Sequence, residues 1–312
     1  MNKIKISIAF DANIISHAES TPRESDTDDM EMLKSTSTEL LKDLRELVQS
    51  TQGLRLVISD TAFDEISDGN AEKAKNRIKL TQDMEILKDV PEIEKLAGLF
   101  MDEGVFRPKA GNDAMILANA VFYGMDYLVT WNMKDLANER NKRDIKRIIQ
   151  PLSYDLPRLC TGDDFLDDYI ELIGRRLNEH QVGDKGMLYN IDTMTSTKAM
   201  KSTETAKPKY RLLDGKPWDK KSKKEKREWI EVVESSEVMI ESRRWRAKKD
   251  EERRKDPKKY WEDREALRKK WKAQGVKFAP VPPTPPWIKK LLKAHREKLA
   301  AREAAKKKTQ EK

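Results

Sequence analysis

Three acidic residues stand where strands and helices are expected to meet. Asp11 follows an apolar run, Glu65 lies in a helix after a second apolar run, and Asp113 opens the most apolar helical segment of the chain. In a parallel sheet the carboxyl ends of the strands and the starts of the following helices share one edge, where ligands bind. Three carboxylates at that edge would repel one another unless a cation joins them. We therefore expect Asp11, Glu65 and Asp113 to form a metal site.

The donor types restrict which metal such a site would take. Carboxylate oxygens with no histidine or cysteine nearby favour a hard ion, Mg²⁺ or Mn²⁺. A bound divalent ion can deprotonate a water molecule and neutralise charge on a phosphodiester in the transition state. The pattern therefore indicates metal-assisted hydrolysis of a nucleic acid backbone.

Each of these residues also has a simpler interpretation. Asp11 alone would be a turn residue, Glu65 solvated surface, and Asp113 a helix cap or a partner of the helix dipole. Their occurrence together and in this order favours the metal site. Two further candidates stay open, because Thr130 is either a strand-end residue or part of the site, and Asn132 is either a helix cap or part of the site. We expect His17 in a surface loop and Cys160 in the core.

The elements that would position these residues alternate along the first half of the chain. Apolar runs predict strands over 3–10, 54–59, 127–130 and 155–161. Helices are predicted over 30–50, over 60–66 with Asp60 or Thr61 as N-cap, and over 71–89, 92–101, 111–124, 134–138 and 144–149, with Asn112 as the cap of the helix over 111–124. Strands that alternate with helices favour an α/β fold in which helices cover both faces of a parallel sheet.

The second half of the chain has a different composition. Residues 1–173 form the predicted α/β domain, 174–217 a polar linker, and 218–312 a basic, tryptophan-containing helical extension. Helices are expected over 220–254 and, with Asp256 as N-cap and Gly275 as the stop, over 257–275. Residues 280–286 should be extended and 287–305 helical, and residues 300–312 are expected to fray.

The net charge of the 312-residue chain also differs between its two halves. Residues 1–170 carry 22 basic and 32 acidic groups, a net of −10, whereas residues 171–312 carry 41 and 23, a net of +18. The two parts should attract each other, or each should seek a partner of opposite charge. One cysteine excludes an intramolecular disulfide and a cysteine-based zinc finger. The absence of a long apolar run excludes a membrane span, and we expect a cytoplasmic protein.

Four segments of the first half together resemble a known family. They are 8–15 (IAFDANII), 58–66 (ISDTAFDEI), 112–120 (NDAMILANA) and 127–132 (YLVTWN). In this order and spacing they are similar to the four motifs of PIN-domain nucleases, and especially of the VapC-type toxins of toxin–antitoxin pairs. The resemblance covers residues 1–173.

The resemblance implies a PIN-like parallel sheet and Mg²⁺- or Mn²⁺-dependent cleavage of RNA. It places the metal-binding acids on Asp11, Glu65 and Asp113, with Thr130 and Asn132 completing the catalytic set. The family's fourth acid would fall on Asn132, which is an amide, and Asp135 nearby could compensate. Ala12 replaces the usual small hydroxyl residue. The family also implies an RNA substrate, an antitoxin partner and a homodimer.

The basic extension admits three interpretations. It is an RNA-binding arm, in which Lys and Arg meet phosphates and Trp stacks on bases, or a solvated tail. Alternatively, residues 237–275 loosely resemble a helical antitoxin carried in the same chain, with Arg243, Arg244 or Arg246 reaching the carboxylates. The function predicted from sequence is a metal-dependent endoribonuclease whose extension inhibits in cis or binds RNA. The alternative is a non-catalytic RNA-binding or regulatory protein on a degenerate PIN fold, which Asn132 and Ala12 favour.

Overall fold

The computed structural model describes residues 6–21, 23, 26–51, 53–136, 139–149, 156–162, 164–165 and 222–310. The predicted linker over 174–217 lies outside these residues, as do the ends of the predicted domains at 173 and 218.

The first half forms a five-stranded parallel sheet in the order β3-β2-β1-β4-β5. The strands are β1 (Ile6–Phe10), β2 (Leu54–Ser59), β3 (Glu85–Leu87), β4 (Tyr127–Val129) and β5 (Arg158–Cys160). In the central register Ile8 lies beside Leu56, and Phe10 lies beside Val129. Nearly every residue of β1, β2 and β4 is buried, as expected for a sheet covered on both faces. The predicted fold class, a parallel α/β sheet flanked by helices and followed by helices, is confirmed, and the order is consistent with a PIN-like fold.

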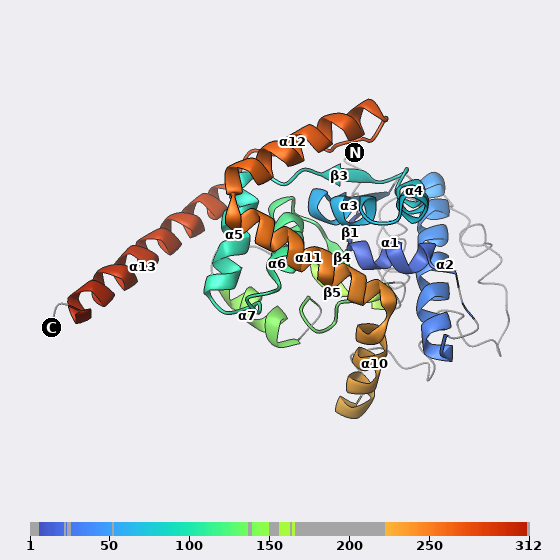
Figure 1. The fold of residues 1–312 in the computed structure, drawn as a ribbon, viewed down its shortest axis with the longest axis horizontal. Helices are drawn as coiled ribbons and strands as arrows, with labels where there is room; N and C mark the ends of the chain where they lie inside the picture. Colours follow the sequence, from blue (N-terminus) through green and yellow to red (C-terminus); the bar gives the residue numbers. More distant parts are fainter. Residues whose placement is uncertain are drawn as a thin grey trace, which may run out of the picture.

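The flanking helices connect the strands and leave their carboxyl ends at one edge of the sheet (Figure 1). They are α1 (Ala12–Glu19), α2 (Asp28–Thr51), α3 (Asp60–Ser67), α4 (Ala71–Leu80), α5 (Pro91–Asp102), α6 (Gly111–Phe122) and α7 (Glu139–Ile149). The N-cap of α3 is Ser59, whose hydroxyl accepts from the Ala62 N–H at 3.1 Å; it is not Asp60 or Thr61, as predicted.

Two predicted helices were wrong. The helix expected over 71–89 ends at Leu80, and the chain turns into β3, because a three-residue strand is too short to show alternation. The helix expected over 134–138 is a turn through Leu136, and α7 begins at Glu139.

The extension consists of α10 (Lys223–Ser235), α11 (Glu237–Lys255), α12 (Pro257–Ala273) and α13 (Pro286–Gln310). The single predicted helix over 220–254 is divided at Ser236, which caps α11 by accepting from Met239 N–H. Asp256 caps α12 with Pro257 in its first turn, and Gly275 follows the helix with φ +85°, both as predicted. Helix α13 continues past residue 305 to Gln310, where fraying was expected.

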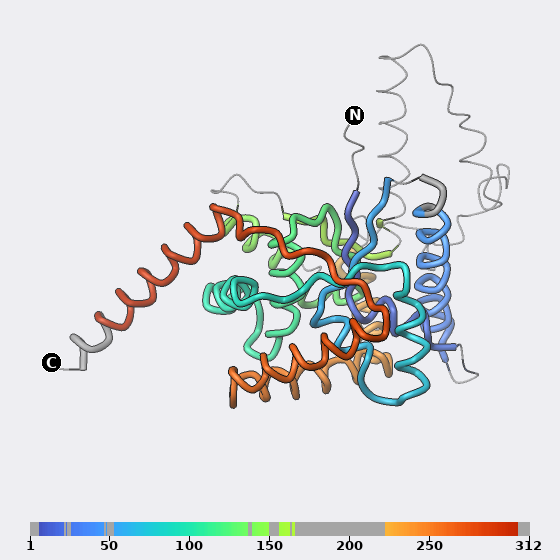
Figure 2. Tube along the Cα trace, turned by 90° about the horizontal axis from the view of Figure 1, so that it is seen from above, coloured from blue at the N-terminus to red at the C-terminus, as the bar shows by residue number. Residues whose placement is uncertain are grey.

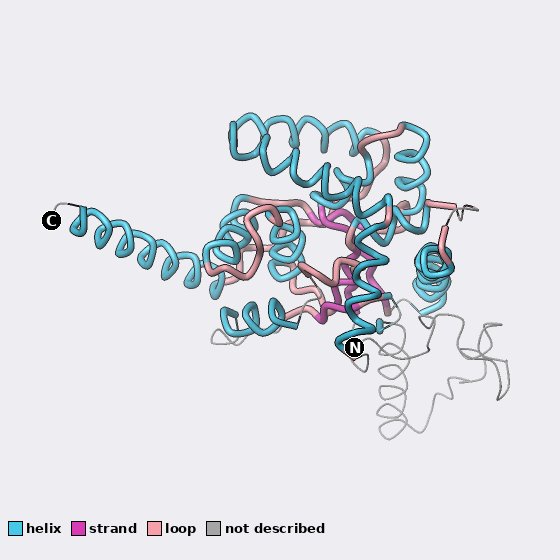
Figure 3. Tube along the Cα trace, turned by 60° about the horizontal axis from the view of Figure 1, so that its bottom comes forward, coloured by secondary structure: helices cyan, strands magenta, loops and turns pink. Residues whose placement is uncertain are grey.

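Helices α10, α11 and α12, which we call the strap, pack against the first half of the chain, and α11 lies over the sheet edge. Helix α11 crosses the carboxyl ends of the strands, and α12 returns beside it (Figures 1 and 3). Trp229, Val233 and Trp271 belong to the same buried cluster as the sheet. Trp271 contacts Phe63 edge-on, with ring centroids 4.7 Å apart.

After α12 the chain joins the sheet itself. The Ile86 N–H donates to the Lys277 carbonyl at 2.9 Å, and the Ala279 N–H donates to the Ile86 carbonyl at 2.8 Å. This parallel bridge places residue 278 at the β3 edge, so it covers an otherwise open strand. The extension is therefore packed into the fold and is not a free tail.

Candidate active site

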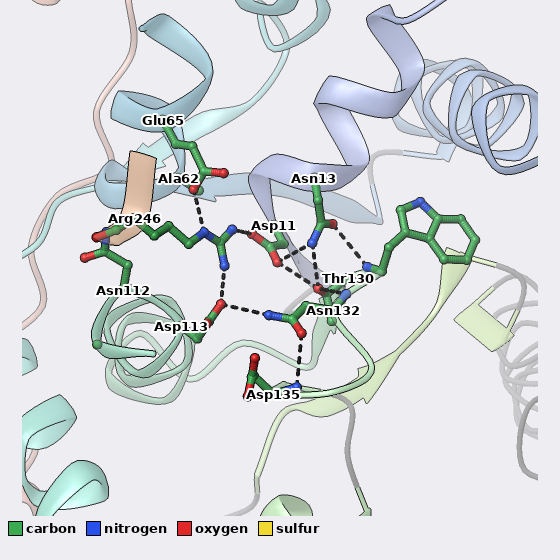
Figure 4. A network of polar contacts seen from close by, with 12 residues as sticks. Asp11, Asn13, Ala62, Glu65, Asn112, Asp113, Thr130, Asn132, Asp135 and Arg246 are labelled. Atoms are coloured by element: carbon green, nitrogen blue, oxygen red, sulfur yellow. Dashed lines mark hydrogen bonds and ion pairs between the residues drawn. The ribbon is translucent and has the colours of Figure 1, made fainter. Parts of the chain in front are cut away.

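The sheet edge brings the three predicted acids together, each from a different element (Figure 4). Asp11 ends β1 and precedes α1, without capping it through its side chain. Glu65 lies in α3, and Asp113 lies in the first turn of α6. All three are buried, and Asp11 is 0% exposed. The sequence predicted their convergence, but it did not predict that another element would cover them.

Arg246 of α11 fills the space between the three carboxylates. Its Nη2 lies 2.6 Å from Asp11 Oδ1 and its Nε lies 2.7 Å from Glu65 Oε2, while its Nη1 donates to Asp113 Oδ1. Arg246 is 4% exposed, so the ion pairs are shielded from solvent. Of the three arginines considered from sequence, Arg246 is the one that reaches the acids, whereas Arg243 pairs with Glu234.

Asp11 is held from its other side by two polar residues. Thr130 Oγ1 and Asn13 Nδ2 donate to Asp11 Oδ2 at 2.7 and 2.8 Å. Asn13 Oδ1 also accepts from the Trp131 N–H at 3.1 Å, which ties α1 to the end of β4. Thr130, one of the predicted site residues, thus contacts Asp11. Asn13 was missed, although its place two residues after Asp11 in the apolar α1 was a usable signal.

Asn132 positions Asp113. Its Nδ2 donates to Asp113 Oδ1 at 3.0 Å, and its Oδ1 accepts from the Asp135 N–H at 3.0 Å. The amide therefore presents a donor to the carboxylates, where an acid would present charge. The Asp135 carboxylate is itself bound by Arg107, with Nε 2.9 Å from Oδ1.

The pKa values in this cluster follow from the position of one buried guanidinium among three buried carboxyl groups. Burial raises the pKa of Asp113 to about 7, against the opposing effect of Arg246. Burial likewise raises the pKa of Glu65, again opposed by Arg246. For Arg246, burial alone would lower the pKa, but the carboxylates of Asp11, Glu65 and Asp113 outweigh it and hold the pKa well above its usual value. The arginine is therefore always charged.

A second contact, close to the Arg246 ion pairs, holds α11 against the start of α6. Asp250, one helical turn after Arg246, accepts from the Gly111 N–H at the start of α6 at 3.1 Å. This places a carboxylate at the positive end of the α6 dipole. A Cβ at Gly111 would lie 2.7 Å from the nearer Asp250 oxygen, so only glycine allows the approach. Asn112, predicted as the α6 cap, instead donates through Nδ2 to the Arg246 carbonyl at 3.3 Å.

Helix α12 makes similar ion pairs at a neighbouring acidic cluster. Arg264 Nη2 lies 2.9 Å from Asp60 Oδ1 and Arg264 Nη1 lies 3.3 Å from Asp64 Oδ2. Arg268 pairs with Asp60 and donates to the Asp89 carbonyl at 2.9 Å. The Asp89 carboxylate accepts from Thr61 Oγ1 at 2.6 Å. The sequence did not predict this cluster, because the helix expected over 71–89 included Asp89.

His17, expected in a surface loop, is buried in α1. Its Nδ1 lies 2.7 Å from the Asn13 carbonyl and its Nε2 lies 3.2 Å from Ser236 Oγ. A carbonyl only accepts, so Nδ1 carries the proton and Nε2 accepts from the Ser236 hydroxyl. Burial lowers the pKa of His17 to about 4. Cys160 is a buried core residue, as predicted.

The donor chemistry of Asp11, Glu65 and Asp113 suits a hard divalent ion, but their present arrangement suits a guanidinium. In the part of the chain that the structure describes, no group of three or more His, Cys, Asp or Glu residues is arranged to hold a metal ion. The planar Arg246 head spreads the carboxylates around three nitrogen atoms, whereas a metal needs their oxygens at about 2.0–2.1 Å from one point. Arginine and metal therefore exclude each other.

Comparisons with known proteins add little to this geometry. No family model and no curated protein matches the chain. One solved structure, VapBC2 from Rickettsia felis bound to a DNA fragment from its promoter, is similar over 50% of this chain and 98% of its own, at 16% identity and a TM-score of 0.31. At that score the likeness carries no argument. Separately, no helix among the described residues is long and apolar enough to cross a membrane.

Proposed function

We propose that this chain is a PIN-type, divalent-metal-dependent endoribonuclease that its own strap holds closed. The observation that carries the proposal is the ion pairing of Arg246 with all three carboxylates of the predicted metal site. A cation seated on three acids from three separate elements identifies a place built to attract positive charge. The helix that delivers the cation also covers the sheet edge where a substrate would approach (Figure 1).

In the open state the residues of this edge have distinct tasks. Asp11, Glu65 and Asp113 would hold Mg²⁺ or Mn²⁺, which supplies an activated water and neutralises phosphodiester charge when bound. Thr130 and Asn13 fix the Asp11 carboxylate through Oδ2 and leave Oδ1 directed into the site. Asn132 holds Asp113 by donating to Oδ1, the same oxygen that Arg246 contacts. The substrate class, RNA, is a proposal that rests on the motif resemblance.

The second candidate is a non-catalytic RNA-binding or regulatory protein on the same fold. It is favoured by the integration of the extension, whose residues 277 and 279 bond to Ile86 of the sheet edge. It is also favoured by Asn132, an amide where the resembled family carries an acid. On this alternative Arg246 is a permanent structural ion-pair partner.

One experiment separates the two candidates. Arg246→Met in the full chain removes the guanidinium but keeps an apolar side chain of similar length. Single-turnover cleavage of labelled RNA should then appear with Mn²⁺, disappear with EDTA, and be absent from the unaltered chain. The double variants Arg246→Met/Asp11→Asn and Arg246→Met/Asp113→Asn should bind RNA but not cleave it. If Arg246→Met folds, binds Mn²⁺ and leaves RNA intact even when Asp250→Ala also removes the contact of α11 with Gly111, the nuclease proposal is wrong.

A further inference from the structure

The front of the molecule would repel the polyanion that the proposed nuclease must bind. Residues 1–170 carry a net charge of −10. Six acids gather at the carboxyl edge of the sheet, namely Asp11, Asp60, Asp64, Glu65, Asp89 and Asp113. The strap arginines nearest to them are already engaged in ion pairs. These arginines are therefore not free to meet a phosphate backbone, which leaves the exposed cations outside the ion pairs, among them Lys269, Lys270 and Lys272 of α12 and those of α13.

Helix α13 provides a surface of such cations. It leaves the body beside α5 and projects outward, as Figures 1 and 2 both show. From Pro286 to Ala304 it carries six lysines and arginines against two glutamates. All six are exposed; Lys298 pairs with Glu103, and Arg302 acts electrostatically on the same carboxylate. The charged groups of the other four make no hydrogen bond or ion pair with another described residue: Lys289, Lys290, Lys293 and Arg296. We call these four residues the basic arm. Lys289, Lys293 and Arg296 follow a spacing of four and three, so they line one side of the helix.

The contacts of α13 with the body end partway along its length. Ile288 and Leu292 are buried, His295 Nε2 lies 3.0 Å from Asp102 Oδ2, and Lys298 Nζ lies 2.6 Å from Glu103 Oε1. The residues beyond Leu299 that have described side chains are exposed. These contacts hold the first half of α13 against the body, so the basic arm has a fixed position relative to the fold.

The chemistry of the exposed side selects the kind of partner. The large apolar residues of α13 up to Ala304 are buried or half-buried, so the exposed side offers none to a membrane or to an apolar groove. A row of unpaired cations is recognised by a polymer with regularly spaced negative charge. Helix α10 shows the contrast, because its basic residues alternate with Glu225, Glu228, Glu231 and Glu234.

We propose that the basic arm of α13 binds the phosphate backbone of single-stranded RNA and holds it on the protein. This inference rests on the proposed function for the identity of the polyanion. It assigns RNA binding to α13, whereas the basic clusters of α11 and α12 that the sequence suggested include arginines that close the acidic edge.

The test uses the full chain in EDTA, so that binding is measured without cleavage. The variant Lys289→Gln/Lys290→Gln/Lys293→Gln/Arg296→Gln is compared with a matched control, Lys223→Gln/Lys224→Gln/Lys226→Gln/Arg227→Gln on α10. Binding of a fluorescein-labelled single-stranded RNA is followed by anisotropy at several KCl concentrations. Four lost phosphate contacts should reduce the slope of log K against log[KCl] by about 3. We expect the α13 variant to bind at least tenfold more weakly near 0.1 M KCl and the control to remain within twofold.

Two outcomes would overturn the inference: an α13 variant that binds like the unaltered chain, and a control that loses as much affinity. Competition by a glutamate polymer at equal charge concentration, as effective as RNA itself, would also overturn it. All variants are checked by circular dichroism, and Lys289→Gln/Lys293→Gln replaces the fourfold change if that change unwinds α13. Loss of RNA binding in the α13 variant, together with an Arg246→Met chain that cleaves nothing, would leave this inference standing and reject only the nuclease.

Discussion

Replacing Arg246 should make the chain bind and be stabilised by a divalent ion. In the unaltered chain the guanidinium contacts all three carboxylates, so a metal has to displace it. In Arg246→Met the acids are left without their cation. Removing one partner from a buried ion pair costs about 3–5 kcal/mol of unfolding free energy. We expect the loss without metal to be smaller at pH 6 than at pH 8, because removal of the guanidinium raises the pKa of Asp113 above its value of about 7 and the carboxyl group takes up a proton.

Mn²⁺ should recover much of this loss. At a free concentration one hundred times the dissociation constant, a ligand that binds only the folded state stabilises it by about 2.7 kcal/mol. For a chain of this size that corresponds to a rise in Tm of roughly 5–10 °C. The assay is thermal unfolding at increasing Mn²⁺, with the exposed neighbour Arg244→Ala as the matched control. An equal rise in all three proteins, or no rise in Arg246→Met, would refute the competition between arginine and metal.

The other predictions concern neighbouring residues. Asn132→Asp, made in the Arg246→Met background, should tighten Mn²⁺ binding in calorimetric titration, because a fourth negative ligand joins the three acids; unchanged affinity would mean that residue 132 does not act on the site. His17 should make the fold acid-sensitive: its pKa is about 4 in the folded chain against an ordinary value of 6.5, so the unfolded chain binds the proton more tightly. The contribution of His17 to the unfolding free energy is therefore fully present above pH 6.5, and it falls by roughly 3 kcal/mol as the pH drops to 4. His17→Gln should remove this acid-side decrease in unfolding free energy, as measured by urea unfolding at several pH values. Arg268→Ala should lower the unfolding free energy by about 3–5 kcal/mol without creating a Mn²⁺-dependent Tm rise, since Asp60 and the Asp89 carbonyl lose a buried donor.

The acids of the site could be predicted because their positions follow from local pattern. An apolar run ending in Asp11 and an apolar helix opening with Asp113 are visible in the sequence, and parallel topology then joins their ends. Strand β3 could not be predicted in this way, since three residues show no period. Because β3 was missed, Asp89 and the second arginine cluster were missed with it.

The covering of the site depends on contacts between residues far apart in the chain. From the sequence, Arg246 was only one of three candidate arginines. Which of the three faces the acids depends on the register of α11, and that register is set by Ser236 at its start and by the Asp250 contact with Gly111. His17 was misplaced for the same reason, because its burial comes from Ser236, 219 residues away.

We propose that Arg246 occupies the place of a catalytic metal. The most direct measurement is the anomalous scattering of Mn²⁺ in crystals of Arg246→Met and of the unaltered chain, soaked at the same concentration. We expect a peak bounded by Asp11, Glu65 and Asp113 in Arg246→Met and none there in the unaltered chain. A peak elsewhere, or an empty cluster in an Arg246→Met crystal whose solution activity depends on Mn²⁺, would contradict the claim.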